Sequence, residues 1–250
     1  MAELKTIVAG QPVTFGKRGE LDTIRVENRF ATFEMTLHGA HVTSYTPRGG
    51  RDLLWLSKES NFASGKPIRG GVPICWPWFG PHPAGAPFPA HGYARLARWD
   101  LLAARTLPTG ETRLLLRLDR TAIPAEIPQL ELEAEFTVTI GSRLELELAT
   151  YNVSDSALTV TEALHSYFAV ADIAEVVITG LEATRYLDKV AGDEKIESGP
   201  IVIDREVDRI YCDTAAAVVI DDRAGNRRIT VAKHNSRSTV VWNPWIEKSR

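Results

Sequence analysis

The chain has little that would tie it to a disulfide framework, a membrane or a nucleic acid. Its 250 residues include two cysteines, Cys75 and Cys212, and cysteines so far apart predict neither a disulfide scaffold nor a zinc-ligand pair. No apolar run approaches the roughly 18–20 residues of a membrane span, and the N-terminal residues lack the order of a signal peptide. The 29 Lys and Arg against 32 Asp and Glu give a net charge of −3, which supplies no field for a polyanion. We therefore expect a cytoplasmic protein that binds neither membrane nor nucleic acid.

Motifs for nucleotides and metals are also missing. The RGG at residues 69–71 has neither the spacing nor the strand-to-helix setting of a phosphate-binding glycine motif. No HExxH, CxxC or two-His-one-carboxylate spacing occurs. His38 and His41 lie three residues apart, which places their side chains on opposite faces of a strand unless Gly39 makes a turn. The sequence therefore predicts no cofactor and no metal site.

Alternation of apolar and polar residues is the clearest periodic signal. Residues 130–140 alternate leucine, alanine, phenylalanine, valine and isoleucine with glutamate and threonine, which predicts a strand with one buried face. A Gly-Ser turn follows, and residues 144–148 alternate again, so the two runs predict an antiparallel hairpin. Further β-rich runs are expected at 23–27, 30–37, 41–46, 112–118, 158–164, 174–179, 199–203, 216–221, 228–232 and 238–242.

No window shows sustained helical periodicity. Strands that recur without helical crossovers indicate a large sandwich of antiparallel sheets. We therefore expect one all-β domain that spans residues 1–250. Since no long exposed apolar stripe stands out, we expect a monomer.

Residues 65–92, here called the aromatic loop, break the strand pattern. The segment is rich in proline and glycine, which excludes a regular strand or helix, and it carries Trp76, Trp78 and Phe79. Long loops within a compact domain are usually functional or disordered, and an aromatic cluster argues against disorder. We expect an ordered loop that lines a cleft. The alternative is that the three aromatic side chains close one end of the sandwich.

Two histidines are candidates for acid–base chemistry or substrate binding. His165 follows a β-rich run and has Leu164, Tyr167 and Phe168 as neighbours, so a partly desolvated imidazole would titrate near or below neutrality. A core histidine bonded to the backbone is the alternative. His91 lies in PAHGYAR, where a loop presents it together with a permanent cation, Arg95.

Two arginines flank the aromatic part of the loop. Arg69 lies in the apolar, glycine-rich segment IRGGVP, where an unpartnered charge is costly. The planar guanidinium groups of Arg69 and Arg95 match phosphate or carboxylate oxygens, so the pair suits an anionic substrate. Asp208 and Arg209 could face the same cleft or form a surface ion pair.

Five segments in this order carry a family resemblance. IRGGVPICWPWFG, PAHGYAR, ALHSYFAV, VDRIY and VVWNPW resemble the hexose-6-phosphate mutarotases, or glucose-6-phosphate 1-epimerases, of the aldose 1-epimerase superfamily. The resemblance implies a galactose-mutarotase-like β-supersandwich and cofactor-free exchange of the α and β anomers of glucose 6-phosphate and related hexose 6-phosphates. It implies that His165 donates a proton to the ring oxygen, that Arg69 and Arg95 hold the sugar phosphate, and that His91 and Asp208 line the sugar site.

The resemblance also implies a difference from the family. Its general base is a glutamate that lies some tens of residues beyond the WNPW segment, whereas this sequence ends at Arg250. Glu247 is near the end but does not sit in the motif of that base. We therefore expect the 250 residues to lack the C-terminal strands of the fold. A sugar-phosphate-binding or regulatory module without catalysis is one alternative, and a mutarotase for unphosphorylated aldoses is another.

Overall fold

The computed structural model describes residues 8–82, 84–85, 88–123, 125, 127 and 130–248. Regular structure in this part of the chain is almost entirely β-strand, with three short 3-10 helices, Ala94–Leu96, Arg120–Ala122 and Ile173–Glu175. No described helix has the length and apolar character to cross a membrane. The chain divides into two compact units, Met1–Ala169 and Val170–Arg250, and each is described by itself below.

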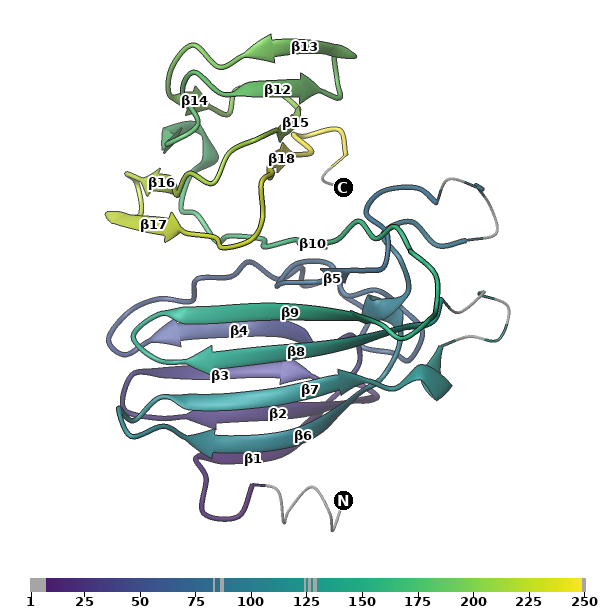
Figure 1. Cartoon of the computed structure of the whole chain (residues 1–250). Helices are drawn as coiled ribbons and strands as arrows, with labels where there is room; N and C mark the ends of the chain where they lie inside the picture. The colour runs from purple at the N-terminus through teal and green to yellow at the C-terminus, as the bar shows by residue number, and fades with distance from the viewer. Residues whose placement is uncertain are drawn as a thin grey trace. The chain divides into compact units, whose positions relative to one another are not determined.

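The first unit is a sandwich of two four-stranded antiparallel sheets. Figure 1 shows the two sheets as separate layers, and one apolar cluster contains side chains from both. One sheet has the order β1 (Val13–Arg18), β2 (Leu21–Glu27), β3 (Ala31–Thr36) and β4 (His41–Pro47). The other has the order β6 (Trp99–Thr106), β7 (Thr112–Leu118), β8 (Leu132–Ile140) and β9 (Leu144–Asn152).

The predicted hairpin forms strands β8 and β9 at one side of the second of these sheets, with β9 at its edge. Strand β8 buries its apolar residues, and Phe136 is 0% exposed. Phe136 lies opposite Leu148 in the hairpin register. Burial of a phenylalanine side chain stabilises a fold by about 1.5–3 kcal/mol, so a register slip of one residue, which would turn this face to water, is strongly disfavoured.

A short third sheet in the first unit joins β5 (Ile74–Cys75) to β10 (Ala163–Leu164). Backbone hydrogen bonds extend the pairing beyond these strands: the amide of His165 donates to Pro73 O at 3.1 Å and that of Thr161 to Pro77 O at 3.2 Å. The regular strands are short because a proline has no amide hydrogen to donate. The carbonyls of these prolines still accept, so the two segments stay aligned.

The second unit contains two further four-stranded antiparallel sheets. One has the order β14 (Ile201–Val202), β11 (Val176–Thr179), β16 (Val218–Asp222) and β17 (Arg227–Val231). The other has the order β13 (Asp193–Ile196), β12 (Arg185–Asp188), β15 (Val207–Tyr211) and β18 (Thr239–Asn243).

The all-β, antiparallel architecture expected from the sequence is confirmed. The expected run at 158–164 is wrong for most of its length, since only Ala163–Leu164 is a strand. Before this strand the pairing is irregular: the amide of Thr161 donates to Pro77 O at 3.2 Å, but residues 158–162 form no regular strand. Of the run at 199–203 only β14 is regular. That residues 1–250 act as a single domain stays a prediction.

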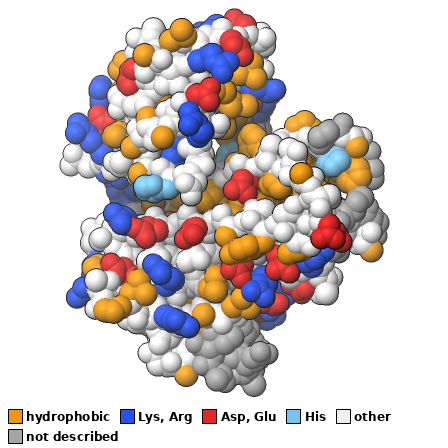
Figure 2. Space-filling view, viewed as in Figure 1, with side chains coloured by type: hydrophobic (Ala, Val, Ile, Leu, Met, Phe, Trp, Pro, Cys, Tyr) orange, Lys and Arg blue, Asp and Glu red, His pale blue; other side chains and the backbone are white. Residues whose placement is uncertain are grey.

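Charged side chains show no single-sign patch on the face drawn in Figure 2, where Lys and Arg are interspersed with Asp and Glu. The mixture of both signs on this face is consistent with the small net charge of the chain, −3. This face therefore offers no broad positive field to an anionic ligand.

Candidate functional site

Four of the five predicted site residues lie in the first unit, around the pairing of β5 with β10. His165 directly follows β10, and Arg69 lies shortly before β5. His91 and Arg95 lie in the segment that follows, with Arg95 in the 3-10 helix Ala94–Leu96. An isolated bridge between Trp76 and Gly92 ties this segment to the end of β5. The structure therefore brings these four residues to one region.

Two glycines permit the close approach of these segments. Gly71 has φ +62°, and a Cβ there would lie 2.2 Å from Val42 O. Gly92 has φ +71°, and a Cβ there would lie 1.9 Å from Trp76 O. Neither the backbone conformation nor the space tolerates a side chain. The glycines of the RGG and HG motifs are thus explained by backbone packing that positions the neighbouring Arg69 and His91.

His165 is half-buried, and its ring stacks on that of Tyr167 with centroids 4.4 Å apart and planes 13° from parallel. Burial is the main cause that lowers the pKa of His165 to about 4; a proton on His91 and the charge of Arg95 act in the same direction, and a backbone hydrogen bond opposes the shift. The direction agrees with the sequence-based expectation. The value lies further below neutrality than reversible acid–base catalysis at neutral pH requires.

Arg95 is the cation common to this region. Its Nη2 donates to Ala90 O at 2.9 Å, while its Nε is buried and has no hydrogen-bond partner in the part of the chain that the structure describes. None of the ion pairs among the described residues includes Arg95. Its charge lowers the pKa values of His91 and His165. A half-buried guanidinium without a carboxylate partner is a favourable place for an anion.

His91 is held in one orientation by its own backbone and by Gly80. Its amide donates to Gly80 O at 2.7 Å, and its Nδ1 accepts from Gly80 N at 3.1 Å. Burial, then the charge of Arg95, lowers the pKa of His91. In a neutral imidazole whose Nδ1 is an acceptor, the proton is on Nε2, so His91 presents a fixed Nε2–H donor.

Arg69 is held through its main chain. Its amide donates to Ser60 Oγ at 3.1 Å, and its carbonyl accepts from that hydroxyl at 2.9 Å. Burial raises the pKa of the Tyr167 phenol, while the charges of Arg69 and Arg95 both act to lower it. The two arginines therefore lie within electrostatic reach of the same tyrosine, whose ring stacks on that of His165.

Asp208 lies in the second unit, in β15, opposite Trp242 of β18. It is half-buried, and burial raises the pKa of its carboxyl group. Its place in the sugar site stays a prediction. The neighbouring Arg209 pairs with Glu197 at 2.9 Å rather than with Asp208, so the surface ion pair considered from the sequence does not form between these two residues.

The aromatic loop contributes mainly to the core. Trp76 is 0% and Trp78 8% exposed, and both belong to the apolar cluster of the first unit. The indole Nε1 of Trp76 donates to Thr150 Oγ1, and that of Trp78 to Pro89 O. The alternative interpretation, in which these rings close the sandwich, therefore applies to both tryptophans. Phe79 is half-buried, and its ring lies 5.1 Å from that of His91.

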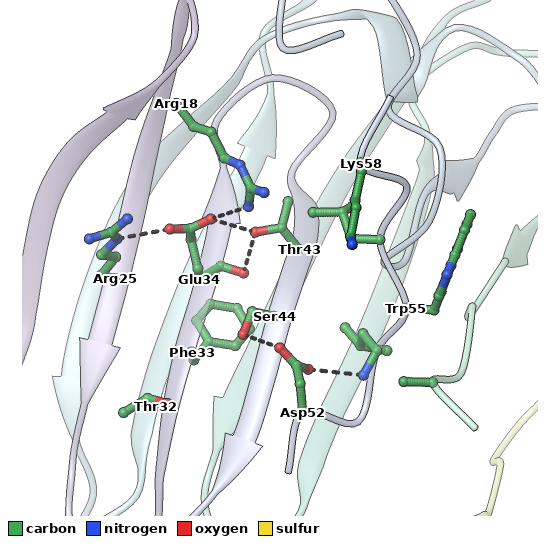
Figure 3. A pocket seen from close by; sticks show the side chains of 13 residues that line it. Arg18, Arg25, Thr32, Phe33, Glu34, Thr43, Ser44, Asp52, Trp55 and Lys58 are labelled. Carbon is green, nitrogen blue, oxygen red and sulfur yellow. Dashed lines mark hydrogen bonds and ion pairs between the residues drawn. The ribbon is translucent and has the colours of Figure 1, made fainter. Parts of the chain in front are cut away.

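A cavity of about 850 Å³ over strands β1–β4 contains none of the predicted residues. Figure 3 shows Arg18 and Arg25 directed at Glu34, and Asp52 bonded to Ser44. Glu34 accepts hydrogen bonds from Arg18 at 3.1 Å, Arg25 at 2.8 Å and Thr43 at 3.0 Å. Because these groups satisfy each other, the cavity has the character of a structural ion-pair cluster. Trp55 lines its edge and stacks on Tyr167.

The remaining buried histidines are structural. His41 Nε2 donates to Gly70 O at 2.7 Å, and His38 Nε2 lies 3.0 Å from Lys66 O. Burial lowers the pKa of His41 to about 4, so the ring is neutral and supports the backbone beside Arg69. Across the described ranges, no group of three or more His, Cys, Asp and Glu side chains is arranged to hold a metal ion.

Comparison with known proteins decides the family. The model of the aldose 1-epimerase family matches residues 22–250. The chain belongs to the aldose 1-epimerase family. An Escherichia coli K12 protein provisionally named glucose-6-phosphate 1-epimerase is 35% identical over 239 residues, which cover 91% of this chain and 76% of the relative. A Salmonella typhimurium relative with the same provisional name is 36% identical over 227 residues, which cover 90% and 75%.

Solved structures agree with this family assignment. A crystal structure from Salmonella typhimurium, provisionally described as a mutarotase, has a TM-score of 0.85 and 34% identity and covers 93% of this chain and 77% of that one. A galactose mutarotase-like protein from Lactobacillus casei has a TM-score of 0.70 at 16% identity, covering 91% and 84%. The galactose-mutarotase-like fold is thus confirmed, and family membership supports an isomerase that acts on a sugar.

Tyr167 is a residue of the candidate site that sequence reasoning does not single out. The sequence shows it as an aromatic neighbour of His165, and the spacing of two residues between them is the signal that could have identified it. Residues two apart on an extended segment point to the same side, so His165 and Tyr167 were bound to share a face once residues 163–167 are extended. Sequence periodicity did not show that extension, because Ala163–Leu164 is the only regular strand there.

Burial of His165 makes the stability of the fold depend on pH. Its pKa is about 4 when folded against an ordinary value of 6.5, so the unfolded state binds more protons between these values and acid favours unfolding. The contribution is fully present above about pH 6.5 and is lost as the pH falls through about 4. On going from about pH 7.5 to about pH 5, His165→Gln should lose roughly 1–2 kcal/mol less unfolding free energy than the wild type, as measured by chemical denaturation.

The same comparison at higher pH provides the control. Between about pH 7.5 and about pH 8.5 an imidazole is neutral in both the folded and unfolded states, so the two proteins should change in parallel. If wild type and variant lost equal stability on acidification, the burial of a neutral His165 would be contradicted.

Proposed function

We propose that the protein interconverts the α and β anomers of glucose 6-phosphate and related hexose 6-phosphates. The observation that carries this proposal is the half-buried guanidinium of Arg95, which has no ion-pair partner among the described residues. Burial lowers the pKa values of His91 and His165, and the charge of Arg95 adds to this effect. Such a cation beside two neutral imidazoles suits an anionic sugar better than a neutral one. The names of the relatives in Escherichia coli and Salmonella typhimurium support the same substrate.

The reaction consists of proton transfers and the opening and reclosure of one C–O bond, without a change of oxidation state, and the proposal therefore needs no cofactor. An acid protonates the ring oxygen while a base takes the proton of the C1 hydroxyl, and the C1–O5 bond opens to the aldehyde. Rotation about C1–C2 presents the other carbonyl face, and the roles reverse on closure. We assign the acid to His165. A positioned acid or base contributes on the order of 10²–10⁴ in rate.

The other residues bind and orient. Arg69 and Arg95 hold the phosphate, since each presents a fork of donors that matches its oxygens. His91 offers its fixed Nε2–H to a sugar oxygen. The part of Asp208 in sugar binding rests on the family resemblance alone. Orientation of this kind removes entropy before the reaction begins. The carboxylate that takes the C1 proton is not assigned to a residue of this chain.

A second candidate follows from the titration of His165. With a pKa of about 4, its imidazole carries little charge at neutral pH and is then a poor acid. This favours a module that binds a sugar phosphate without turning it over. The two candidates, enzyme and binding module, differ in whether a bound phosphate raises the pKa of His165 enough for its imidazole to be protonated.

Anomer exchange tests the enzymatic proposal directly. Pure α-glucose 6-phosphate is mixed with the protein, and the approach to anomeric equilibrium is followed by NMR. We expect acceleration by the wild type and a loss of roughly 10²–10⁴-fold in kcat for His165→Gln, because the ring oxygen loses its proton donor.

The matched control for exchange is His234→Gln, since His234 is an exposed histidine of the second unit and its variant should behave like the wild type. Calorimetric binding of glucose 6-phosphate without any acceleration would favour the binding module. Absence of both binding and exchange would exclude both candidates.

The phosphate contact makes Arg95→Met informative. We expect the KM for glucose 6-phosphate to rise roughly 10- to 100-fold, because charge-assisted hydrogen bonds to the phosphate are lost. The KM of the wild type should rise with salt, and that of the variant should rise less.

Arg98→Met is the matched control, because Arg98 is close in sequence but pairs with Asp22 and Asp100, and its KM should stay near the wild-type value. A mutarotase for unphosphorylated aldoses would instead show little change in Arg95→Met.

Phosphate binding should also raise the pKa of His165. A phosphate dianion beside Arg95 offsets one of the charges that lower this pKa, and an anion nearby favours the imidazolium. NMR titration of the His165 ring, with and without saturating glucose 6-phosphate, measures the shift. Glucose is the control and should leave the pKa near about 4. An unchanged pKa with the sugar phosphate would count against His165 as the acid.

A further inference from the structure

The ring of His165 lies in a short aromatic stack. Its centroid is 4.4 Å from that of Tyr167, with the planes 13° apart. Tyr167 in turn stacks with Trp55 at 6.0 Å and 30°. Trp55 is 42% exposed, so the stack runs from the edge of the fold to the imidazole. Aromatic pairs in such geometry have a preferred mutual orientation, which fixes the plane of each ring.

The backbone holds the members of this stack in register. The amides of His165 and Tyr167 donate to Pro73 O at 3.1 Å and Gly71 O at 2.9 Å. The amide of Trp55 donates to Tyr167 O at 2.9 Å, and its carbonyl accepts from Gly71 N at 2.7 Å. Three segments distant in sequence are therefore connected in a closed circuit of main-chain bonds. The stack is built on this circuit, which leaves the rings little freedom to shift.

We propose that Tyr167 is a positioning residue, whose ring holds the imidazole of His165 in the plane from which it delivers its proton to the sugar ring oxygen. This inference rests on the proposed function, because it gives His165 the role of acid. Torsion about the bond to an imidazole is broad and roughly twofold, so a histidine alone would sample several ring planes. A parallel neighbour 4.4 Å away removes most of this freedom.

The ring of Tyr167 also suits the charged state through which His165 must pass. An aromatic face attracts a cation, whereas an aliphatic side chain of equal volume would only exclude water. The groups that oppose protonation of His165 are His91 and Arg95. Those that act on the phenol are Arg69, Arg95 and Cys75. The aromatic face stacked on the imidazole therefore both orients the ring and tolerates its charge.

The test separates the ring from its volume. Tyr167→Leu fills space without an aromatic face, and Tyr167→Phe keeps the face and removes the hydroxyl. We expect kcat for anomer exchange to fall roughly 10- to 100-fold in the leucine variant, as for a misplaced catalytic group. Its KM should stay within about threefold, because substrate contacts remain. Tyr167→Phe should recover at least about tenfold of the lost kcat.

Proton NMR of the His165 ring provides a readout independent of turnover. The ring current of a parallel aromatic neighbour shifts the imidazole protons upfield. This shift should be present in the wild type and in Tyr167→Phe and absent in Tyr167→Leu. Tyr151→Ala, at an exposed tyrosine of β9, is the control and should change neither the shift nor kcat.

A second variant guards against misfolding. Trp55→Leu alters the outer ring of the stack at a partly exposed position, and it should reduce kcat less than Tyr167→Leu while it leaves KM unchanged. The positioning role is overturned if Tyr167→Leu keeps kcat within about twofold of an active wild type, or if Tyr167→Phe is as impaired as the leucine variant.

An inactive wild type would instead overturn the proposed enzymatic function, and the positioning role with it. The activity of the wild type therefore distinguishes the two failures.

Discussion

The pairing of residues 71–77 with residues 161–167 is the constraint on which the candidate site depends. It is a small sheet, with two residues in each regular strand, but it places His165 opposite Pro73 and Tyr167 opposite Gly71. The large sheets of the first unit supply the apolar burial that stabilises the fold. The short pairing supplies position. A shift of one residue in its register would turn His165 toward the side that Leu164 now occupies.

Close main-chain packing around this pairing also explains the glycines of the RGG and HG motifs. Gly71 and Gly92 each lie where a Cβ would collide with a backbone carbonyl. Main-chain packing at these glycines therefore helps to position their neighbours Arg69 and His91. Arginine side chains are long and flexible, and a cation can be aimed only if its main chain is fixed. Here the glycines and prolines fix the main chain.

Sequence reasoning was most successful where one period governs a segment. The alternation through Phe136 gave the hairpin, because burial on one face dictates it. It failed for β6, where a bulge between Leu101 and Ala103 interrupts the period, and for the charged edge strand β13, whose residues are all exposed. The residue types of the candidate site could be recognised in the sequence, but the proximity of residues such as Arg95 and His165 in space could not. It depends on non-local pairing across prolines and on positive φ angles, neither of which has a local pattern.

Under the proposed function, the charge that recruits the substrate also restrains the catalyst. Arg95 favours a phosphate, yet its potential and that of His91 reinforce burial in keeping His165 neutral. A bound phosphate relieves part of this restraint by raising the pKa of His165, so a larger fraction of the rings carries the proton to be donated when an anion is present. An unphosphorylated sugar of the same shape would meet an imidazole that remains uncharged. Discrimination between the two sugars then arises from the protonation state of the acid as well as from affinity, because only a substrate that brings its own negative charge completes the site.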